Sequence, residues 1–150
     1  VYLTERFVQH DPPAAEELEN LHGAISLELD TLPMGTIDPG VIQSCAGTAG
    51  TITTLAAIDQ GLEVYDPARI NGYVLQKAAL DRMVSMLASA TIAQREQIAG
   101  IERGREDIIL AGAMITQEIM LRCGAREMLV CDWGLREGIL FDLYERMHLK

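Results

Sequence analysis

A glycine and threonine segment, Gly47–Thr51, holds the residue types best suited to anion binding in this 150-residue chain. It follows an apolar, β-branched stretch and leads into a short apolar helix, so that backbone N–H groups at the helix start converge on one place. Glycine allows the backbone to approach a ligand closely. Threonine hydroxyls can cap the helix or face the ligand, and the segment offers four of them: Thr48, Thr51, Thr53 and Thr54. No lysine follows Gly50, so this is not a Walker loop, and an ordinary strand-to-helix turn fits the same residues.

Arg105 is the second candidate, because it stands at the predicted start of a helix over Arg105–Cys123. The amino end of a helix favours an anion, and a guanidinium there reinforces phosphate binding. A salt bridge to Glu106 or Asp107 is the competing interpretation. The candidate phosphate-binding residues are therefore Gly47, Thr48, Gly50, Thr51 and Arg105.

Two predicted strands decide whether these residues meet. If Val41–Cys45 and Met128–Cys131 are parallel neighbours, their carboxyl ends share one sheet edge. That edge would bring the Gly47–Thr51 loop close to the Asp132–Gly138 loop, where Gly134 and Arg136 would line the cleft. Arg136 paired with Glu137 to fix the last helix is the alternative.

The sequence contains no complete catalytic set. The three histidines, His10, His22 and His148, lie far apart in the sequence at presumed helix ends or surfaces. The three cysteines, Cys45, Cys123 and Cys131, lack metal-ligand spacing, which indicates buried free thiols. No nucleophile elbow or zinc-binding helix is recognisable. We therefore expect no metal site and no catalytic residue within this chain.

The apolar pattern predicts a helix-rich α/β fold. A helix should begin at Asp11-Pro12-Pro13, with Asp11 as its cap, and end near Pro33; another should bury Leu80, Met83, Val84 and Leu87. The Arg105–Cys123 helix should be central, and Asp132 should cap a last helix running towards Met147. A third strand is expected at Val1–Leu3, and a small extended piece is expected within the loop over Asp59–Gln76. We expect one unit over residues 1–150, cut from a longer protein because so narrow a sheet leaves an edge unpaired.

Charge and hydropathy narrow the class of partner. A net charge of −10 disfavours nucleic acid and anionic membranes as partners, and apolar stretches end before membrane-spanning length. Without a signal-peptide pattern, a cytoplasmic protein is expected.

Four segments in fixed order resemble the exopolyphosphatase and guanosine pentaphosphate phosphohydrolase family over nearly the whole chain. They are LTERF followed by HDPP (Leu3–Pro13), GTAGTITTLAAI (Gly47–Ile58), REQIAGIERGREDIILAGAMI (Arg95–Ile115) and WGLREGIL (Trp133–Leu140). The chain looks like the C-terminal half of such a protein. The resemblance implies a partial ribonuclease H-like domain of the actin and sugar-kinase superfold, with two parallel strands in a narrow sheet.

The same resemblance implies hydrolysis of terminal phosphoanhydride bonds in polyphosphate or guanosine pentaphosphate, assisted by Mg²⁺, with water as nucleophile. The general base would be a glutamate of the N-terminal domain, upstream of Val1, so this half alone should be inactive. Arg105 matches the arginine of the family's Arg-Ala-Asp motif, while Gly50 and Thr51 match its second glycine loop. The chain departs from the family at three places: Ala49-Gly50, Ala99-Gly100 and Arg105-Glu106-Asp107. A non-catalytic nucleotide- or alarmone-sensing module and a helical interaction domain are the alternatives. The missing N-terminal domain and a second copy of the chain are the protein partners considered.

Overall fold

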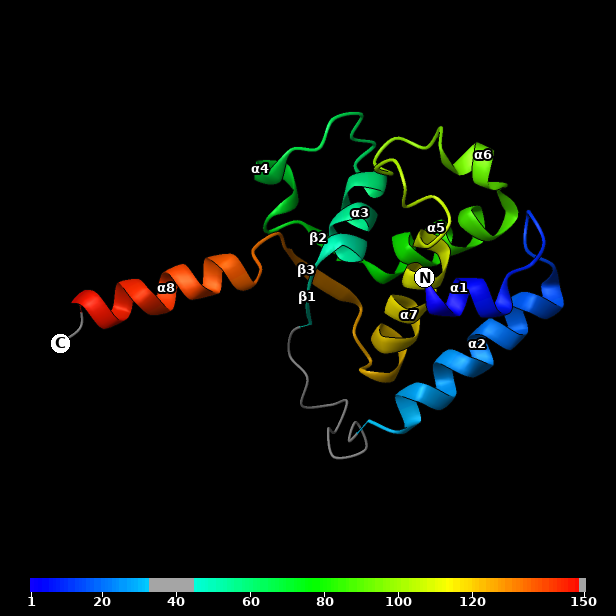
Figure 1. The fold of residues 1–150 in the computed structure, drawn as a ribbon, viewed down its shortest axis with the longest axis horizontal. Coiled ribbons are helices and arrows are strands. Elements are labelled where there is room, and N and C mark those ends of the chain that lie inside the picture. The colour runs from blue at the N-terminus through cyan, green and yellow to red at the C-terminus, as the bar shows by residue number, and fades with distance from the viewer. Residues whose placement is uncertain (33–44, 149–150) are drawn as a thin grey trace.

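The computed structural model describes residues 1–32 and 45–148 of the chain (Figure 1). Eight helices and three strands lie within these ranges: α1 Tyr2–Phe7, α2 Ala15–Asp30, β1 Ala46–Thr48, α3 Gly50–Asp59, α4 Pro67–Ile70, β2 Val74–Gln76, α5 Lys77–Ser89, α6 Ile92–Arg95, α7 Ile109–Arg122, β3 Glu127–Cys131 and α8 Leu135–His148. The prediction of a helix-rich α/β fold is confirmed. No helix within these ranges combines the length and apolar character needed to cross a bilayer.

The sheet has the order β1-β3-β2, with β3 in the centre. β1 pairs with β3 in parallel, Gly47 opposite Val130, which confirms two parallel neighbours in a narrow sheet. β2 pairs with β3 in the antiparallel sense, Leu75 opposite Met128, and is the small extended piece expected within Asp59–Gln76. The carboxyl ends of β1 and β3 therefore lie at one edge of the sheet.

One face of the sheet is packed, and no other described residues cover the opposite face. Leu75, Met128 and Val130 alternate along β2 and β3 and are buried, whereas Val74 and Leu129 on the opposite face are partly exposed. α3 contacts all three strands, α7 packs on α3 and α5, and α2 packs on the far side of α7. α7 is thereby enclosed from several sides, as its apolar circumference predicted.

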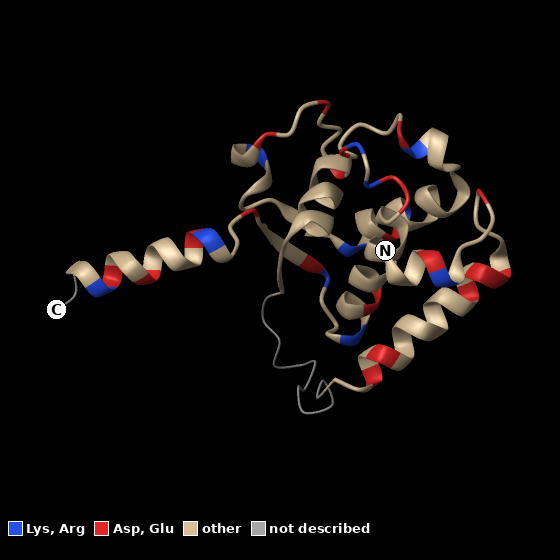
Figure 2. Cartoon of the chain, viewed as in Figure 1, with Lys and Arg blue, Asp and Glu red and all other residues tan. Residues whose placement is uncertain are grey.

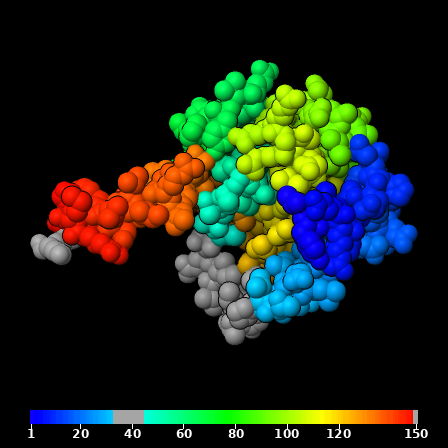
Figure 3. All heavy atoms as spheres, in the orientation of Figure 1, coloured from blue at the N-terminus to red at the C-terminus, as the bar shows by residue number. Residues whose placement is uncertain are grey.

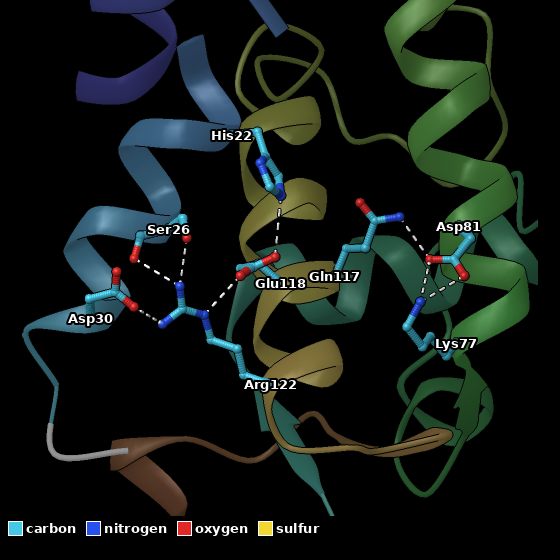
Figure 4. A network of polar contacts seen from close by, with 8 residues as sticks. All are labelled: His22, Ser26, Asp30, Lys77, Asp81, Gln117, Glu118 and Arg122. Atoms are coloured by element: carbon cyan, nitrogen blue, oxygen red, sulfur yellow. Dashed lines mark hydrogen bonds and ion pairs between the residues drawn. The ribbon is translucent and has the colours of Figure 1, made fainter. Parts of the chain in front are cut away.

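A polar network fastens α2 to α7 (Figure 4). The Arg122 guanidinium on α7 donates to Glu118 Oε1 at 2.8 Å and to Asp30 Oδ1 at 2.6 Å. It also donates to the Ser26 carbonyl at 2.9 Å, and His22 lies 3.3 Å from Glu118. These contacts draw α2 against the buried helix.

Several predicted boundaries are wrong. Val1–Leu3 is not a strand, because Tyr2–Phe7 forms α1. Asp11 does not cap α2; it accepts a hydrogen bond from the Ile92 N–H, while Glu17 Oε2 accepts from the Ala14 N–H at the true start of α2. Asp132 does not cap α8, since its carboxylate accepts a hydrogen bond from the Tyr65 hydroxyl. The strand predicted at Val41–Cys45 falls mostly outside the described residues, and β1 begins just after it.

The thiols and histidines follow the prediction only in part. Cys45, Cys123 and Cys131 are free but half-buried rather than buried, and burial raises the pKa of the Cys45 thiol. His10 and His22 are exposed and each faces a glutamate, Glu17 and Glu118. The predicted apolar stripe of α5 is confirmed: Leu80, Met83 and Leu87 are buried in the core, and Val84 packs against it partly buried.

Candidate anion-binding site

The turn between β1 and α3 presents the start of a ten-residue helix. Ala49 is the residue before that helix, with φ 73° and ψ 169°, a conformation almost confined to glycine. No side chain caps the α3 amino end, so its first-turn N–H groups have no side-chain acceptor among the described residues. Thr53 donates back to the Gly50 carbonyl instead, at 3.2 Å. The turn thus leaves N–H groups available to an anion.

The two predicted loops meet. The Thr48 hydroxyl donates to the Trp133 carbonyl at 2.8 Å, across 85 residues of sequence. This contact follows from the parallel pairing of β1 and β3, which ends both strands at one edge (Figure 1). The rim therefore combines the Gly47–Thr51 turn with the segment that begins α8.

Arg105 lies against the turn. A Cβ atom added to Gly50 would fall 2.6 Å from Arg105 Nη2 and 2.7 Å from Cζ, so only glycine leaves room for the guanidinium there. Arg105 Nε donates to Glu102 Oε2 at 2.9 Å, and the Arg105 side chain is 35% exposed. One positive group thus sits beside the amino end of α3 while its outer face reaches solvent.

The backbone around Arg105 differs from the prediction. α7 begins at Ile109, and Arg105 precedes it by one turn, its carbonyl accepting from the Ile109 N–H at 2.9 Å. Its ion-pair partner is Glu102 rather than Glu106 or Asp107. Glu106 turns back to accept from the Gly104 N–H at 2.6 Å, and hydrogen bonds from backbone N–H groups, its own foremost, lower its pKa. The Glu106 carboxylate is therefore occupied within its own turn.

The remaining candidates have different surroundings. Gly47 lies so close to the Met128 side chain that an added Cβ atom would clash with its sulfur. Thr51 packs against Gly112 of α7 in the same way. Both residues therefore pack the turn against its neighbours. The Gly134 N–H donates to Glu137 Oε2 at 2.7 Å at the start of α8. Arg136 is exposed in the first turn of α8 and makes no hydrogen bond or ion pair within the described chain. The structure therefore brings Thr48, Gly50 and Arg105 together and leaves Arg136 at the periphery.

Three neighbouring side chains were not anticipated from the sequence as parts of this site. Glu102 holds Arg105, and the Tyr65 hydroxyl donates to Asp132 at the end of β3. Burial, followed by that hydrogen bond, raises the pKa of Tyr65 to about 12. Arg95 is 2% exposed and donates to the Leu87 and Glu106 carbonyls at 2.9 and 3.2 Å. Arg95 thus ties the segment that carries Arg105 to the end of α5.

A metal site is not formed by these residues. No group of three or more histidine, cysteine, aspartate or glutamate side chains within residues 1–32 and 45–148 is arranged to hold a metal ion. Two carboxylates around this site are already engaged, Glu102 with Arg105 and Asp132 with Tyr65. Mg²⁺ favours oxygen ligands in octahedral geometry, commonly one or two carboxylates with substrate phosphates and water. The described residues do not fit such a site by themselves.

The similarity to known proteins covers nearly the whole chain. A family model described as the Ppx/GppA phosphatase family matches residues 1–147. Exopolyphosphatase 2 of Mycobacterium tuberculosis is 30% identical over 147 residues, which are 95% of this chain and 46% of that protein. A crystal structure of the Aquifex aeolicus member of the Ppx/GppA family superposes with a TM-score of 0.87 at 30% identity, covering 98% of this chain and 46% of that one.

A crystal structure of an exopolyphosphatase from Cytophaga hutchinsonii shares the fold, with a TM-score of 0.78 at 22% identity over 94% of this chain and 46% of that one. The chain thus spans about half the length of the relatives it matches, 46% in each of these three cases. The small sheet with two parallel strands, packed by helices, is the actin-like, ribonuclease H-like architecture that the resemblance implied. This chain belongs to the Ppx/GppA phosphatase family.

Proposed function

We propose that this chain forms one wall of a phosphate-binding cleft in a hydrolase that cleaves terminal phosphoanhydride bonds. Inorganic polyphosphate and guanosine pentaphosphate are the substrates considered, because both end in a chain of phosphates. One observation carries the proposal: the Arg105 guanidinium packs on Gly50 beside the amino end of α3. Helix N–H groups and a guanidinium together suit a phosphate oxygen cluster.

The proposal includes a longer parent protein with a second domain on the other side of the cleft. Two facts support it: the relatives are about twice the length of this chain, and they are named exopolyphosphatases. Among the described residues the acids beside the turn, Glu102 and Asp132, are held by Arg105 and Tyr65. The general base is therefore assigned to the other domain.

The test is the substitution Arg105→Ala in the parent protein, with phosphate release from polyphosphate as the assay. Losing the guanidinium should raise KM or lower kcat, with kcat/KM falling roughly 10- to 100-fold, the range of one charge-assisted contact to a phosphate. Arg103→Ala is the matched control, because Arg103 is exposed on the same segment. Equal kinetics of the Arg105 variant and the wild type would remove this residue from the site.

A requirement for Mg²⁺ is part of the same proposal, with the ligands supplied by the substrate phosphates and the second domain. Chelation of divalent ions should then abolish phosphate release by the parent, and added Mg²⁺ should restore it. The chain alone offers no ligand group for this ion within its described residues.

A non-catalytic sensor is the second candidate, because the Gly47–Thr51 turn and Arg105 suit a phosphate with or without a base from the second domain. It predicts that the parent binds polyphosphate or a guanosine polyphosphate and releases no phosphate. Calorimetric titration beside the release assay separates the two candidates.

A further inference from the structure

Arg105 lies on an irregular segment that connects α6 to α7. Residues 96–108, all of them described, form no helix or strand. The segment passes over the carboxyl end of α3 before it turns back to α7, and its yellow-green atoms lie at the surface beside α3 (Figures 1 and 3). Figure 2 shows both signs of charge along it. The Glu102–Arg105 ion pair joins two residues of the same segment, so other contacts must fix where the segment lies on the molecule.

The first such contact is made by the side chain of Arg95, the last residue of α6. Arg95 is 2% exposed, and its guanidinium donates from Nε to the Leu87 carbonyl at 2.9 Å and from Nη1 to the Glu106 carbonyl at 3.2 Å. Leu87 belongs to α5, whereas Glu106 is the residue next to Arg105. The guanidinium therefore bridges a packed helix and the backbone that carries Arg105.

Packing alone does not account for an arginine at this buried position. Burial lowers the pKa of the Arg95 guanidinium, and the carboxylates of Asp11 and Asp107 act in the opposite direction. Arg95 Nη2 is buried and has no hydrogen-bond partner within the described chain. Well-packed apolar side chains can often replace a buried charge without loss of stability. What the guanidinium adds here is therefore the pair of carbonyl contacts.

The second contact is made by the backbone at Gly100. Its φ is 97°, and a Cβ atom added there would fall 2.5 Å from the carbonyl carbon and 2.7 Å from the carbonyl oxygen of Ala57. Ala57 lies in α3, the helix whose amino end forms part of the Gly47–Thr51 turn. The segment therefore rests directly on the backbone of that helix, and a side chain at position 100 would push the two apart.

We infer that Arg95 and Gly100 are positioning residues of the phosphate site, which hold segment 96–108 so that the Arg105 guanidinium lies on Gly50. Arg95 is too deeply buried to touch a ligand, and Gly100 offers no side chain. Both act by fixing the distance between Arg105 and the amino end of α3, and a misplacement of about 1 Å can lower activity about 100-fold. The effect on substrate rests on the proposed function, whereas the placement of Arg105 can be measured without it.

A double-mutant cycle in the parent protein tests the inference, with phosphate release from polyphosphate as the assay. Arg95→Met and Gly100→Ala should each lower kcat/KM about 10-fold, through the same parameter, KM or kcat, that Arg105→Ala changes. Combined with Arg105→Ala, neither should cause a further loss, because the group that they position is already gone. Arg95→Lys should recover part of the activity, since an ammonium can still reach one of the two carbonyls. Losses that multiply in the combined variants overturn the inference, because the residues would then act independently of Arg105.

Gly61→Ala is the matched control for Gly100→Ala. Gly61 also has a positive φ, 61°, but a Cβ atom added there meets open space. Both alanine variants should lower Tm through backbone strain, and only Gly100→Ala should lower kcat/KM. Equal losses of kcat/KM in the two variants would show that strain, and not displacement of the segment, is responsible. Arg95→Met by itself decides the cycle where Gly100→Ala does not fold.

Crystal structures of the Arg95→Met and Gly100→Ala parent proteins give a readout that does not depend on catalysis. The distance from Gly50 Cα to Arg105 Cζ should increase by about 1 Å or more in each variant. An Arg105 side chain that keeps its wild-type place in both structures overturns the inference. A displaced Arg105, together with wild-type kinetics of Arg105→Ala, would end the proposed function and leave the placement of Arg105 by these two residues standing.

Discussion

Gly50 and Arg105 form a single unit at the scale of residues. The glycine has no side chain where the guanidinium lies, and Glu102 orients that guanidinium from the other side. A methyl group at position 50 would displace Arg105, so the turn and the arginine depend on one another. The anion-binding proposal therefore requires both residues together.

Ala49 gives a stability prediction at the same scale. Its φ of 73° lies in a region that disfavours side chains, so Ala49→Gly should stabilise the chain by about 1 kcal/mol and raise Tm by about 3 °C. Gly104→Ala is the reverse control, since Gly104 has φ 87° with open space around it and should lose similar stability. A lower Tm for Ala49→Gly would show that this backbone is not strained.

At this scale the sequence predicted the members of the turn better than their surroundings. The Gly47–Thr51 pattern and Arg105 stood out because glycine, threonine and arginine suit anions by type alone. Arg95 and Tyr65 did not, because burial of Arg95 and the contact of Tyr65 with Asp132 depend on tertiary packing. The role of the turn in phosphate binding stays a prediction.

At the scale of elements, the α2–α7 pair depends on one fork of hydrogen bonds. Arg122→Met should lower Tm by a few degrees, because Glu118 would lose its strongest partner in a nearly buried position. Arg122→Lys should recover only part of the loss, since an ammonium cannot reach Asp30, Ser26 and Glu118 in the same planar arrangement. Thermal unfolding by circular dichroism measures both variants.

The control for that prediction is Arg126→Met, because Arg126 is exposed and its side chain makes no hydrogen bond in the described chain. It should leave Tm nearly unchanged. Equal losses in the Arg122 and Arg126 variants would mean that charge alone, and not the fork, stabilises the pair.

The sequence predicted the location of elements whose apolar residues recur at regular spacing, but it did not predict the residues at which the helices begin. β3 and α5 lie where their patterns placed them, because Met128, Val130, Leu80 and Leu87 are core residues. α2 starts later than Asp11-Pro12-Pro13 suggested, since Glu17 supplies the first hydrogen bond to the backbone and Asp11 is used by α6. α7 starts later because a turn over residues 106–108 intervenes. The contact between Asp11 and Ile92 joins segments 81 residues apart, so a local sequence pattern does not predict it.

At the scale of the whole molecule, the net charge of −10 creates a mean electrostatic field that repels polyanions. Binding of a polyanion would therefore depend on the local site formed by the Gly47–Thr51 turn and Arg105. The 150-residue chain by itself should therefore release no phosphate from polyphosphate and bind it weakly. Phosphate release and a thermal shift with millimolar polyphosphate measure the two properties; bound ligand would raise Tm. Robust release by these residues alone would contradict the assignment of the general base to a second domain.

Trp133 is the single tryptophan of the chain and is 51% exposed between the Gly47–Thr51 turn and α8. Its carbonyl accepts a hydrogen bond from the Thr48 hydroxyl, and its ring lies tilted against the Phe141 ring. Indole emission depends on how far water reaches the ring, so the molecule carries one native fluorescent reporter beside the turn that we propose to bind phosphate. Quenching by iodide and the emission maximum can follow binding of the proposed ligand without any added label.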